Sequence, residues 1–195
     1  MNCPWITIIT PTIQRESLKA ACESLDRQTF TDWEHIVSID CQPKDLKDDL
    51  LFSLRHPGRW FSCCGQHHNN GGNSCRSRMW ERARGEWVFY LDDDNVLADD
   101  RVLEDLHSAL EGVTEQWALF PIIRLGERFY NDPPGHCRSD TMNMVLRREV
   151  AQWPETTAYG SDGVLIDELL GKGIKYAAFP DFRPIAVIPK ISFCK

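Results

Sequence analysis

An apolar run that ends in three adjacent carboxylates is the feature that most constrains this chain. The apolar residues extend from Trp87 to Leu91, and Asp92, Asp93 and Asp94 follow directly. A short run rich in aromatic and β-branched residues predicts a buried strand, and burial on both faces is typical of a parallel sheet covered by helices. Such sheets bind ligands beyond the carboxyl ends of their strands. We therefore expect the three aspartates at a ligand-binding rim.

The aspartate triplet has two interpretations when it is considered alone. Adjacent carboxylates repel one another and resist burial as bare charges. A hard cation such as Mg²⁺ or Mn²⁺ relieves that repulsion and leaves coordination positions for phosphate oxygens, and the spacing of Asp92 and Asp94 suits it. The alternative is a solvated turn that caps the following helix. The run by itself leaves both interpretations open.

Length and charge limit the classes of protein that remain. The chain has 195 residues, enough for one domain with a substantial core, and a net charge of −7, which disfavours binding to nucleic acid. No apolar run approaches the ~18 residues of a membrane span. The start of the chain, Met1 to Trp5, lacks the basic and apolar segments of a signal peptide. We therefore expect a cytoplasmic protein without a transmembrane segment.

Apolar periodicity predicts alternating strands and helices in a single α/β domain. We expect a mostly parallel, Rossmann-like sheet with helices on both faces. The expected strands are residues 5–10, 33–39, 59–64, 87–91, 117–123 and 174–179. The expected helices are residues 16–28, a short helix within 41–56, then 75–84, 100–110, 147–153 and 161–170. Residues 124–140 are expected to form a loop, and 181–195 a tail.

The ends of the other expected strands also carry polar residues. The first strand ends at Thr10 and Pro11, and the second ends at Asp40. Two glycines precede Ser74, a possible N-cap whose helix could cradle a phosphate, and Arg76 lies in the first turn of that helix. A solvated, salt-bridged face remains the alternative for the arginine. Together these residues make a site for a nucleotide and a divalent metal plausible.

A cluster of cysteine and histidine residues has the residue types of a zinc site but not its usual spacing. The chain has eight cysteines, and the cluster comprises Cys63, Cys64, His67, His68 and Cys75. Paired CxxC motifs are absent from the sequence, and adjacent cysteines are not a usual ligand spacing. We interpret the cluster as ordinary loop and core residues.

Several motifs in a fixed order give the chain a family resemblance. The segments are Pro11-Thr12-Ile13-Gln14-Arg15, Gln28-Thr29-Phe30, the strand that ends at Asp40, Ala83-Arg84-Gly85-Glu86 and Leu91-Asp92-Asp93-Asp94. Over residues 5 to about 170 the chain resembles glycosyltransferase family 2, whose members have the GT-A fold. The resemblance implies a nucleotide-binding half at about 5–95 and an acceptor-side half at about 96–180.

The resemblance also implies roles for residues of the nucleotide-binding half. Asp40 would contact the nucleobase or ribose of a sugar nucleotide. Thr10, Pro11 and Arg15 would line the same pocket, and Arg76 would lie near the base or the diphosphate.

In the aspartate triplet, the resemblance implies that Asp92 and Asp94 hold the diphosphate of the donor, Asp94 through Mn²⁺ or Mg²⁺. Asp93 belongs to the same donor-binding motif, but we expect it to be dispensable. Some family members supply a late histidine to the metal. Because no histidine follows His136, a third protein ligand is not identified.

The catalytic base implied by the resemblance is Asp162. The family has a Glu-Asp pair at the start of a late helix, and here Ser161 replaces the glutamate. Asp140 is the rival base, because it precedes a short apolar segment in the acceptor region, and Asp167 is a weaker rival.

The resemblance implies an inverting transfer of a sugar from a nucleotide-diphosphate sugar, with UDP as the expected nucleotide. The acceptor would be a hydroxyl of a glycan or of a lipid-linked or protein-linked acceptor. A nucleotidyltransferase that makes sugar nucleotides is one alternative, but it would need a glycine-rich loop after the first strand, and Pro11 to Arg15 contain no glycine. A non-catalytic module that binds sugar nucleotides or glycans is the other alternative.

Overall fold

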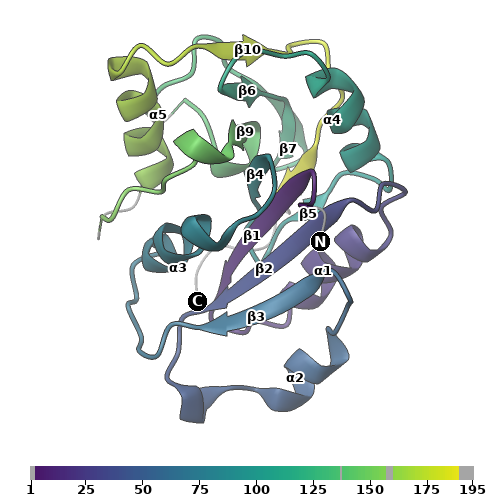
Figure 1. Ribbon diagram of the computed structural model, residues 1–195, viewed down its shortest axis with the longest axis vertical. Coiled ribbons are helices and arrows are strands. Elements are labelled where there is room, and N and C mark those ends of the chain that lie inside the picture. The colour runs from purple at the N-terminus through teal and green to yellow at the C-terminus, as the bar shows by residue number, and fades with distance from the viewer. Residues whose placement is uncertain (1–2, 137, 157–159, 189–195) are drawn as a thin grey trace.

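A seven-stranded sheet of order β10-β6-β9-β4-β1-β2-β3 forms the centre of the molecule (Figure 1). The computed structural model describes residues 3–136, 138–156 and 160–188. The strands are β1 (Ile6–Thr12), β2 (Trp33–Ile39), β3 (Arg59–Cys63), β4 (Trp87–Tyr90), β6 (Trp117–Leu119), β9 (Met144–Arg147) and β10 (Tyr176–Ala178). Strand β9 runs antiparallel to β4 and β6, and the other pairs are parallel. The predicted α/β class and mostly parallel sheet are confirmed.

A smaller, four-stranded sheet was not predicted. Its order is β5-β11-β7-β8, and its strands are β5 (Val96–Leu97), β7 (Ile122–Arg124), β8 (Glu127–Phe129) and β11 (Ala186–Ile188). The single strand expected at 117–123 is two strands, because the chain leaves the large sheet at Phe120 and Pro121. The expected loop and tail thus contain β8 and β11; residues 189–195 of the tail lie outside the described residues.

Helices cover both faces of the large sheet (Figure 1). They are α1 (Leu18–Asp26), α2 (Asp48–Ser53), α3 (Asn73–Met79), α4 (Val102–Leu110) and α5 (Ser161–Gly171). Helices α1 and α4 lie on one face, and α3 and α5 on the other. Among the described helices, none has the length and apolar character that crossing a bilayer requires.

The start of one helix and the length of another differ from the expectation. Helix α3 begins at Asn73 rather than after Ser74, and its N-cap is Gly72, whose φ of 82° is one that glycine adopts without strain. Helix α5 is likewise preceded by a glycine in the left-handed region, Gly160. The helix expected at 147–153 is only a 3₁₀ turn, Arg148–Val150.

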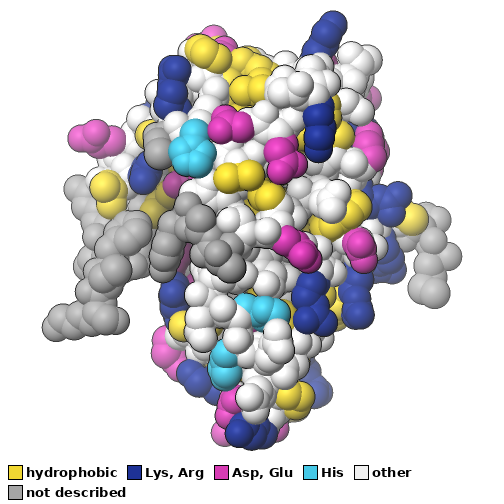
Figure 2. Space-filling view, turned by 90° about the vertical axis from the view of Figure 1, so that its left-hand side faces the viewer, with side chains coloured by type: hydrophobic (Ala, Val, Ile, Leu, Met, Phe, Trp, Pro, Cys, Tyr) yellow, Lys and Arg dark blue, Asp and Glu magenta, His cyan; other side chains and the backbone are white. Residues whose placement is uncertain are grey.

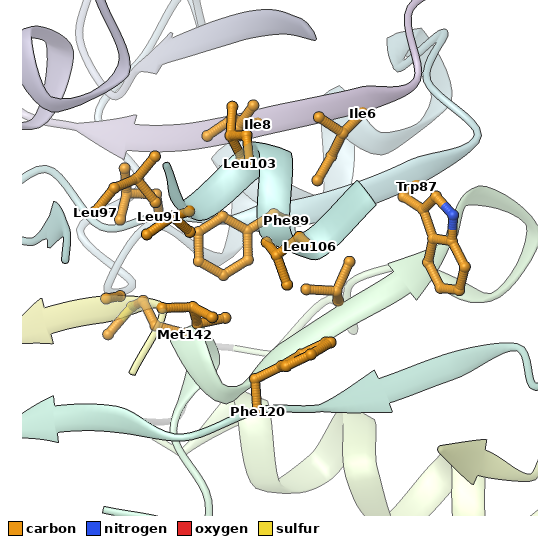
Figure 3. Packing of buried hydrophobic residues seen from close by; sticks show 14 of the residues in the cluster. Ile6, Ile8, Trp87, Phe89, Leu91, Leu97, Leu103, Leu106, Phe120 and Met142 are labelled. Carbon is orange, nitrogen blue, oxygen red and sulfur yellow. The ribbon is translucent and has the colours of Figure 1, made fainter. Parts of the chain in front are cut away.

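Strand β4 is buried on both faces, as its continuous apolar run predicted. Trp87 and Phe89 join Leu91 in the cluster that packs against α4, and Figure 3 shows Phe89 facing Leu106 of that helix. The alternate residue Tyr90 belongs to the opposite cluster, which contains residues of α3 and α5. Because both faces are covered by apolar side chains, the strand delivers its carboxyl end to a fixed position.

A buried glutamate fixes the other end of β4. The Glu34 carboxylate accepts hydrogen bonds from Thr7 Oγ1 at 2.7 Å and from Arg84 Nη2 at 2.6 Å, and Gly85 N–H donates to Thr7 Oγ1 at 2.9 Å. A Cβ on Gly85 would lie 2.5 Å from the backbone nitrogen of Thr7. Only glycine fits here, and the Arg-Gly pair that precedes β4 therefore ties this strand to β1 and β2.

We expect Gly85→Ala to lower the free energy of unfolding by about 1–3 kcal/mol, because its new methyl group meets backbone that cannot move away. Urea denaturation measures this change. Gly171→Ala is the matched control: nothing lies within 4 Å of its Cβ position, so a change within about 0.5 kcal/mol is expected. Equal midpoints for the two variants would contradict the packing argument.

Candidate active site

Two cavities meet at the carboxyl end of β4. The first cavity, of 350 Å³, is lined by the ends of β1 and β2, the loop before α3 and the aspartate triplet. The second cavity, of 290 Å³, extends from the triplet to the first turn of α5. Four residues line both cavities: Gly71, Arg76, Asp92 and Asp94. Figure 2, which views the left-hand side of Figure 1, shows acidic side chains gathered across the middle of this face.

Asp93 is the buried member of the triplet, with 4% of its surface exposed. Its carboxylate accepts hydrogen bonds from Thr12 Oγ1 at 2.6 Å and Arg15 Nη1 at 3.2 Å. Burial raises the pKa of the Asp93 carboxyl, against the opposing effect of the Thr12 hydrogen bond. These contacts give Asp93 a structural role, because its loss would leave a buried hydroxyl without its acceptor. That Asp93 is dispensable for donor binding stays a prediction.

Arg76 stands between the two cavities. Its guanidinium pairs with the Asp92 carboxylate through Nη2, donates from Nη1 to the Gly71 carbonyl at 2.8 Å, and lies 4.7 Å from the centre of the Trp153 ring. Only 5% of the residue is exposed, and Nε has no hydrogen-bond partner among the described residues. A buried guanidinium held in this way offers fixed positive charge to an anion in either cavity.

Asp94 and Asn95 provide further side-chain oxygen atoms at the carboxyl end of β4. The Asp94 carboxylate lies 3.4 Å from Arg15 Nη1, and its side chain is 20% exposed. The Asn95 amide oxygen, on the second cavity, is buried without a partner in the described part of the chain. Carboxylate and amide oxygens are the ligands that Mg²⁺ and Mn²⁺ prefer. The set Asp92, Asp94 and Asn95 therefore fits a hard divalent cation, whereas Asp93 is committed to Thr12 and Arg15.

Two of the residues expected around the nucleoside line the first cavity in the predicted way, and one does not. Pro11 and Arg15 are on its wall. Thr10 is fully buried, with Oγ1 2.9 Å from Nε2 of His35, and does not line this cavity. The reason is that Pro11 does not end β1: the strand pairs with β2 as far as Thr12, which takes the place at the rim.

Asp40 is on the same wall and also organises a loop. Its two carboxylate oxygens accept hydrogen bonds from the backbone N–H groups of His68 at 2.8 Å and Asn69 at 3.0 Å. The predicted position at the end of β2 holds, and the carboxylate additionally fixes the loop that closes the first cavity.

Asp140 and Asp162, the two candidate bases, both line the second cavity. Burial raises the pKa of Asp140 to about 6, with a further contribution from the Asp92 carboxylate. Asp162 lies in the first turn of α5, where Oδ1 accepts from the N–H of Gly163 at 2.9 Å. Asp167 is exposed, 3.7 Å from His136, and is not among the residues that line this cavity.

Sequence reasoning missed the residues that position Asp162. Asn73 Oδ1 accepts from Ser161 Oγ at 2.6 Å and from Trp153 Nε1 at 3.1 Å, which ties the start of α3 to the start of α5. No local sequence pattern indicates that Asn73 has a partner 88 residues away. Ser161, the departure from the family pair, thus has a structural contact of its own.

The raised pKa of Asp140 makes stability depend on pH in a defined direction. The folded chain holds this proton more tightly than the unfolded chain, where the pKa is about 3.9. The contribution of Asp140 to the stability of the folded chain is therefore fully present below pH ~3.9 and is lost as the pH rises through about 6. As the pH rises from 4 to 7.5, we expect the free energy of unfolding of Asp140→Asn to increase by on the order of 1–2 kcal/mol relative to that of the parent protein.

Urea denaturation at the two pH values, with EDTA present, measures this difference. Asp167→Asn, on the exposed face of α5, controls for the loss of one negative charge and should show no comparable change. A difference between Asp140→Asn and the parent protein that is the same at both pH values would contradict the assignment.

Comparison with known proteins identifies the family and supports the fold. Residues 7–170 match the family described as Glycosyl transferase family 2. A GalNAc(5)-diNAcBac-PP-undecaprenol beta-1,3-glucosyltransferase of Campylobacter jejuni is 31% identical over 110 residues, which are 56% of this chain and 36% of the relative. The putative teichuronic acid biosynthesis glycosyltransferase TuaG of Bacillus subtilis is 26% identical over 55% of this chain and 43% of its own. The chain thus matches less than half of the length of either relative.

Solved structures share the fold at low sequence identity. TarS of S. aureus has a TM-score of 0.74 at 15% identity, over 94% of this chain and 60% of the solved chain. The mannosyltransferase PcManGT of Pyrobaculum calidifontis has a TM-score of 0.70 at 15% identity, over 92% of this chain and 56% of its own. Because the family match spans most of the chain and includes β1, the aspartate triplet and Asp162, the chain belongs to glycosyltransferase family 2.

Proposed function

We propose that this chain is an inverting glycosyltransferase that moves a sugar from a UDP-linked donor to a hydroxyl group of an acceptor. The observation that carries the proposal is the meeting of the two cavities at Arg76, Asp92 and Asp94. Positive charge and cation ligands lie at the junction, and candidate bases lie on the far side. A glycosyl transfer brings two substrates together at the anomeric carbon, which is linked to the diphosphate. It therefore needs charge-binding groups on the donor side and a base on the acceptor side.

The first cavity is proposed to hold the nucleoside and the diphosphate. Asp40 and Pro11 form its wall, while Arg15 and Arg76 bring positive charge to the side of the triplet. Mn²⁺ or Mg²⁺, held by Asp94 together with Asp92, would stabilise the negative charge of the leaving diphosphate. Structures of TarS with UDP and with UDP-GlcNAc, and of PcManGT with GDP-Man and Mn²⁺, support this class of donor and cofactor.

The second cavity is proposed to bind the acceptor. The Campylobacter relative is named for an undecaprenol-linked acceptor, GalNAc(5)-diNAcBac-PP-undecaprenol, which supports a lipid-linked or other glycan acceptor. Arg124, Met142 and Trp153 give this cavity a mixed cationic and apolar lining. Such a lining suits a sugar ring that bears hydroxyl groups on one side and C–H groups on the other.

Asp162 is proposed as the general base. It takes the proton of the acceptor hydroxyl as the new bond from that oxygen to the anomeric carbon forms and the bond to the diphosphate oxygen breaks. A single displacement inverts the anomeric centre. Each candidate accepts one backbone hydrogen bond through Oδ1, Asp162 from Gly163 N–H and Asp140 from Met142 N–H. Asp162 is preferred because its place at the start of α5 matches that of the family's base. Asp140 remains the rival.

We expect Asp162→Asn to lower kcat by about 10²–10⁴-fold while the affinity for the donor stays within about threefold, since only proton transfer is lost. The assay measures release of nucleoside diphosphate from a panel of sugar nucleotides, with Mn²⁺ and with EDTA. Asp167→Asn is the matched control on the same helix and should retain full activity.

Two outcomes would overturn parts of this assignment. Full activity of Asp162→Asn together with an inactive Asp140→Asn would transfer the role of base to Asp140. Binding of a sugar nucleotide without release from any donor, in the presence of Mn²⁺ and a range of acceptors, would favour a non-catalytic binding module.

A further inference from the structure

A second group of ligand-type side chains adjoins the first cavity and shares Asp40 with its wall. One ligand atom from each of Asp40, Cys64 and His68 lies within 4.8 Å of the other two. The Cys75 sulfur is 3.2 Å from the Cys64 sulfur, but it is not within 4.8 Å of both Asp40 and His68. These residues come from the end of β2, the end of β3, the following loop and the first turns of α3, so only the fold brings them together.

The imidazole of His68 provides an independent indication of an absent ligand. Its Nε2 atom is buried and has no hydrogen-bond partner among the described residues. The other ring nitrogen, Nδ1, lies 3.5 Å from the side-chain amide of Gln66. Buried polar atoms are almost always paired, and an exception often indicates an ion or a water. His67, the neighbouring residue, is satisfied by the Asp40 carbonyl and by Asp45.

Two thiols, one imidazole and one carboxylate are a ligand set that suits Zn²⁺. Two thiolates on a tetrahedral zinc ion lie about 3.8 Å apart, given Zn–S bonds of about 2.3 Å. Cys64 and Cys75 are free thiols, and zinc binding would separate their sulfur atoms by about 0.6 Å and bring the Cys75 side chain closer to Asp40 and His68. Asp40 already accepts hydrogen bonds from the N–H groups of His68 and Asn69, which orient its carboxylate as such bonds do around metal sites.

We propose that Cys64, His68 and Cys75, with Asp40 as the fourth ligand, bind one structural Zn²⁺ ion. The ion joins β2, β3 and α3 and holds the loop from Gly65 to Gly72 in place. This loop supplies Asn69, Gly71 and Gly72 to the first cavity, so the zinc site supports the donor pocket without taking part in the transfer. The proposal does not depend on the reaction that the chain catalyses.

The test begins with the intact chain, purified under reducing conditions without an immobilised-metal column. We expect elemental analysis to find one zinc per chain after dialysis. Replacement by Co²⁺ should give thiolate-to-cobalt charge-transfer absorption and the d–d bands of a tetrahedral site. Removal of zinc with a strong chelator should lower the melting temperature, and added Zn²⁺ should restore it.

Paired variants identify the ligands. Cys64→Ser and His68→Gln should each weaken zinc binding by at least about tenfold in competition with a chromophoric chelator. Their neighbours Cys63→Ser and His67→Gln are the matched controls and should retain the metal. Asp94→Asn should also retain it, which separates this site from the cation proposed at the triplet. Circular dichroism shows whether each variant is folded, and the cobalt spectrum of the parent protein tests the ligand set even if a variant unfolds.

Three results would overturn the proposal. The first is a freshly purified chain without zinc that also fails to bind added Zn²⁺ or Co²⁺. The second is unchanged zinc affinity in both Cys64→Ser and His68→Gln. The third is a disulfide between Cys64 and Cys75 in protein kept under reducing conditions, which would assign the close sulfur pair to a covalent bond.

Discussion

Three adjacent carboxylates at the end of a buried strand repel one another, so their negative charges must be offset by hydrogen bonds or by positive charge. Much of the site follows from the contacts that do this for each carboxylate. Asp93 is held by Thr12 and Arg15, which lie at the end of β1 and just beyond it. Asp92 is held by Arg76 of α3. The contacts that offset the repulsion within the triplet thereby hold β1, α3 and β4 together at the rim of the sheet.

This arrangement divides the triplet by role. Asp93 points into the structure and secures the strand end, whereas Asp92 and Asp94 border both cavities. Arg76 links the two sides, because its guanidinium pairs with Asp92 and lies over Trp153. Arg76 is thus part of the walls of both cavities. The proposed zinc site adds a second restraint on the loop that completes the first cavity.

The features that could be predicted from the local sequence are those that follow from a simple physical rule, such as the burial of an apolar run. The run from Trp87 to Leu91 had to be a buried strand, and strand ends share one edge, so the positions of Asp40 and Asp94 followed. The position of Thr10 did not follow, because a proline that usually ends a strand is accommodated in β1. The short strand β11 was also missed, although Ile185 to Ile188 form an apolar run rich in β-branched residues, because this run lies within the expected tail and pairs with the distant strands β5 and β7. The contact of Asn73 with Ser161, like the cysteine and histidine cluster, exists only after the chain has folded.

We propose that a divalent cation joins Asp92 and Asp94 to the diphosphate of the donor. Diffraction at the manganese absorption edge, from crystals grown with UDP and Mn²⁺, is the sharpest test of this proposal. We expect one anomalous peak within about 2.5 Å of an Asp94 carboxylate oxygen and in contact with both phosphates. UDP bound in the first cavity with no manganese at the triplet, or manganese found only beside Cys64 and His68, would contradict it.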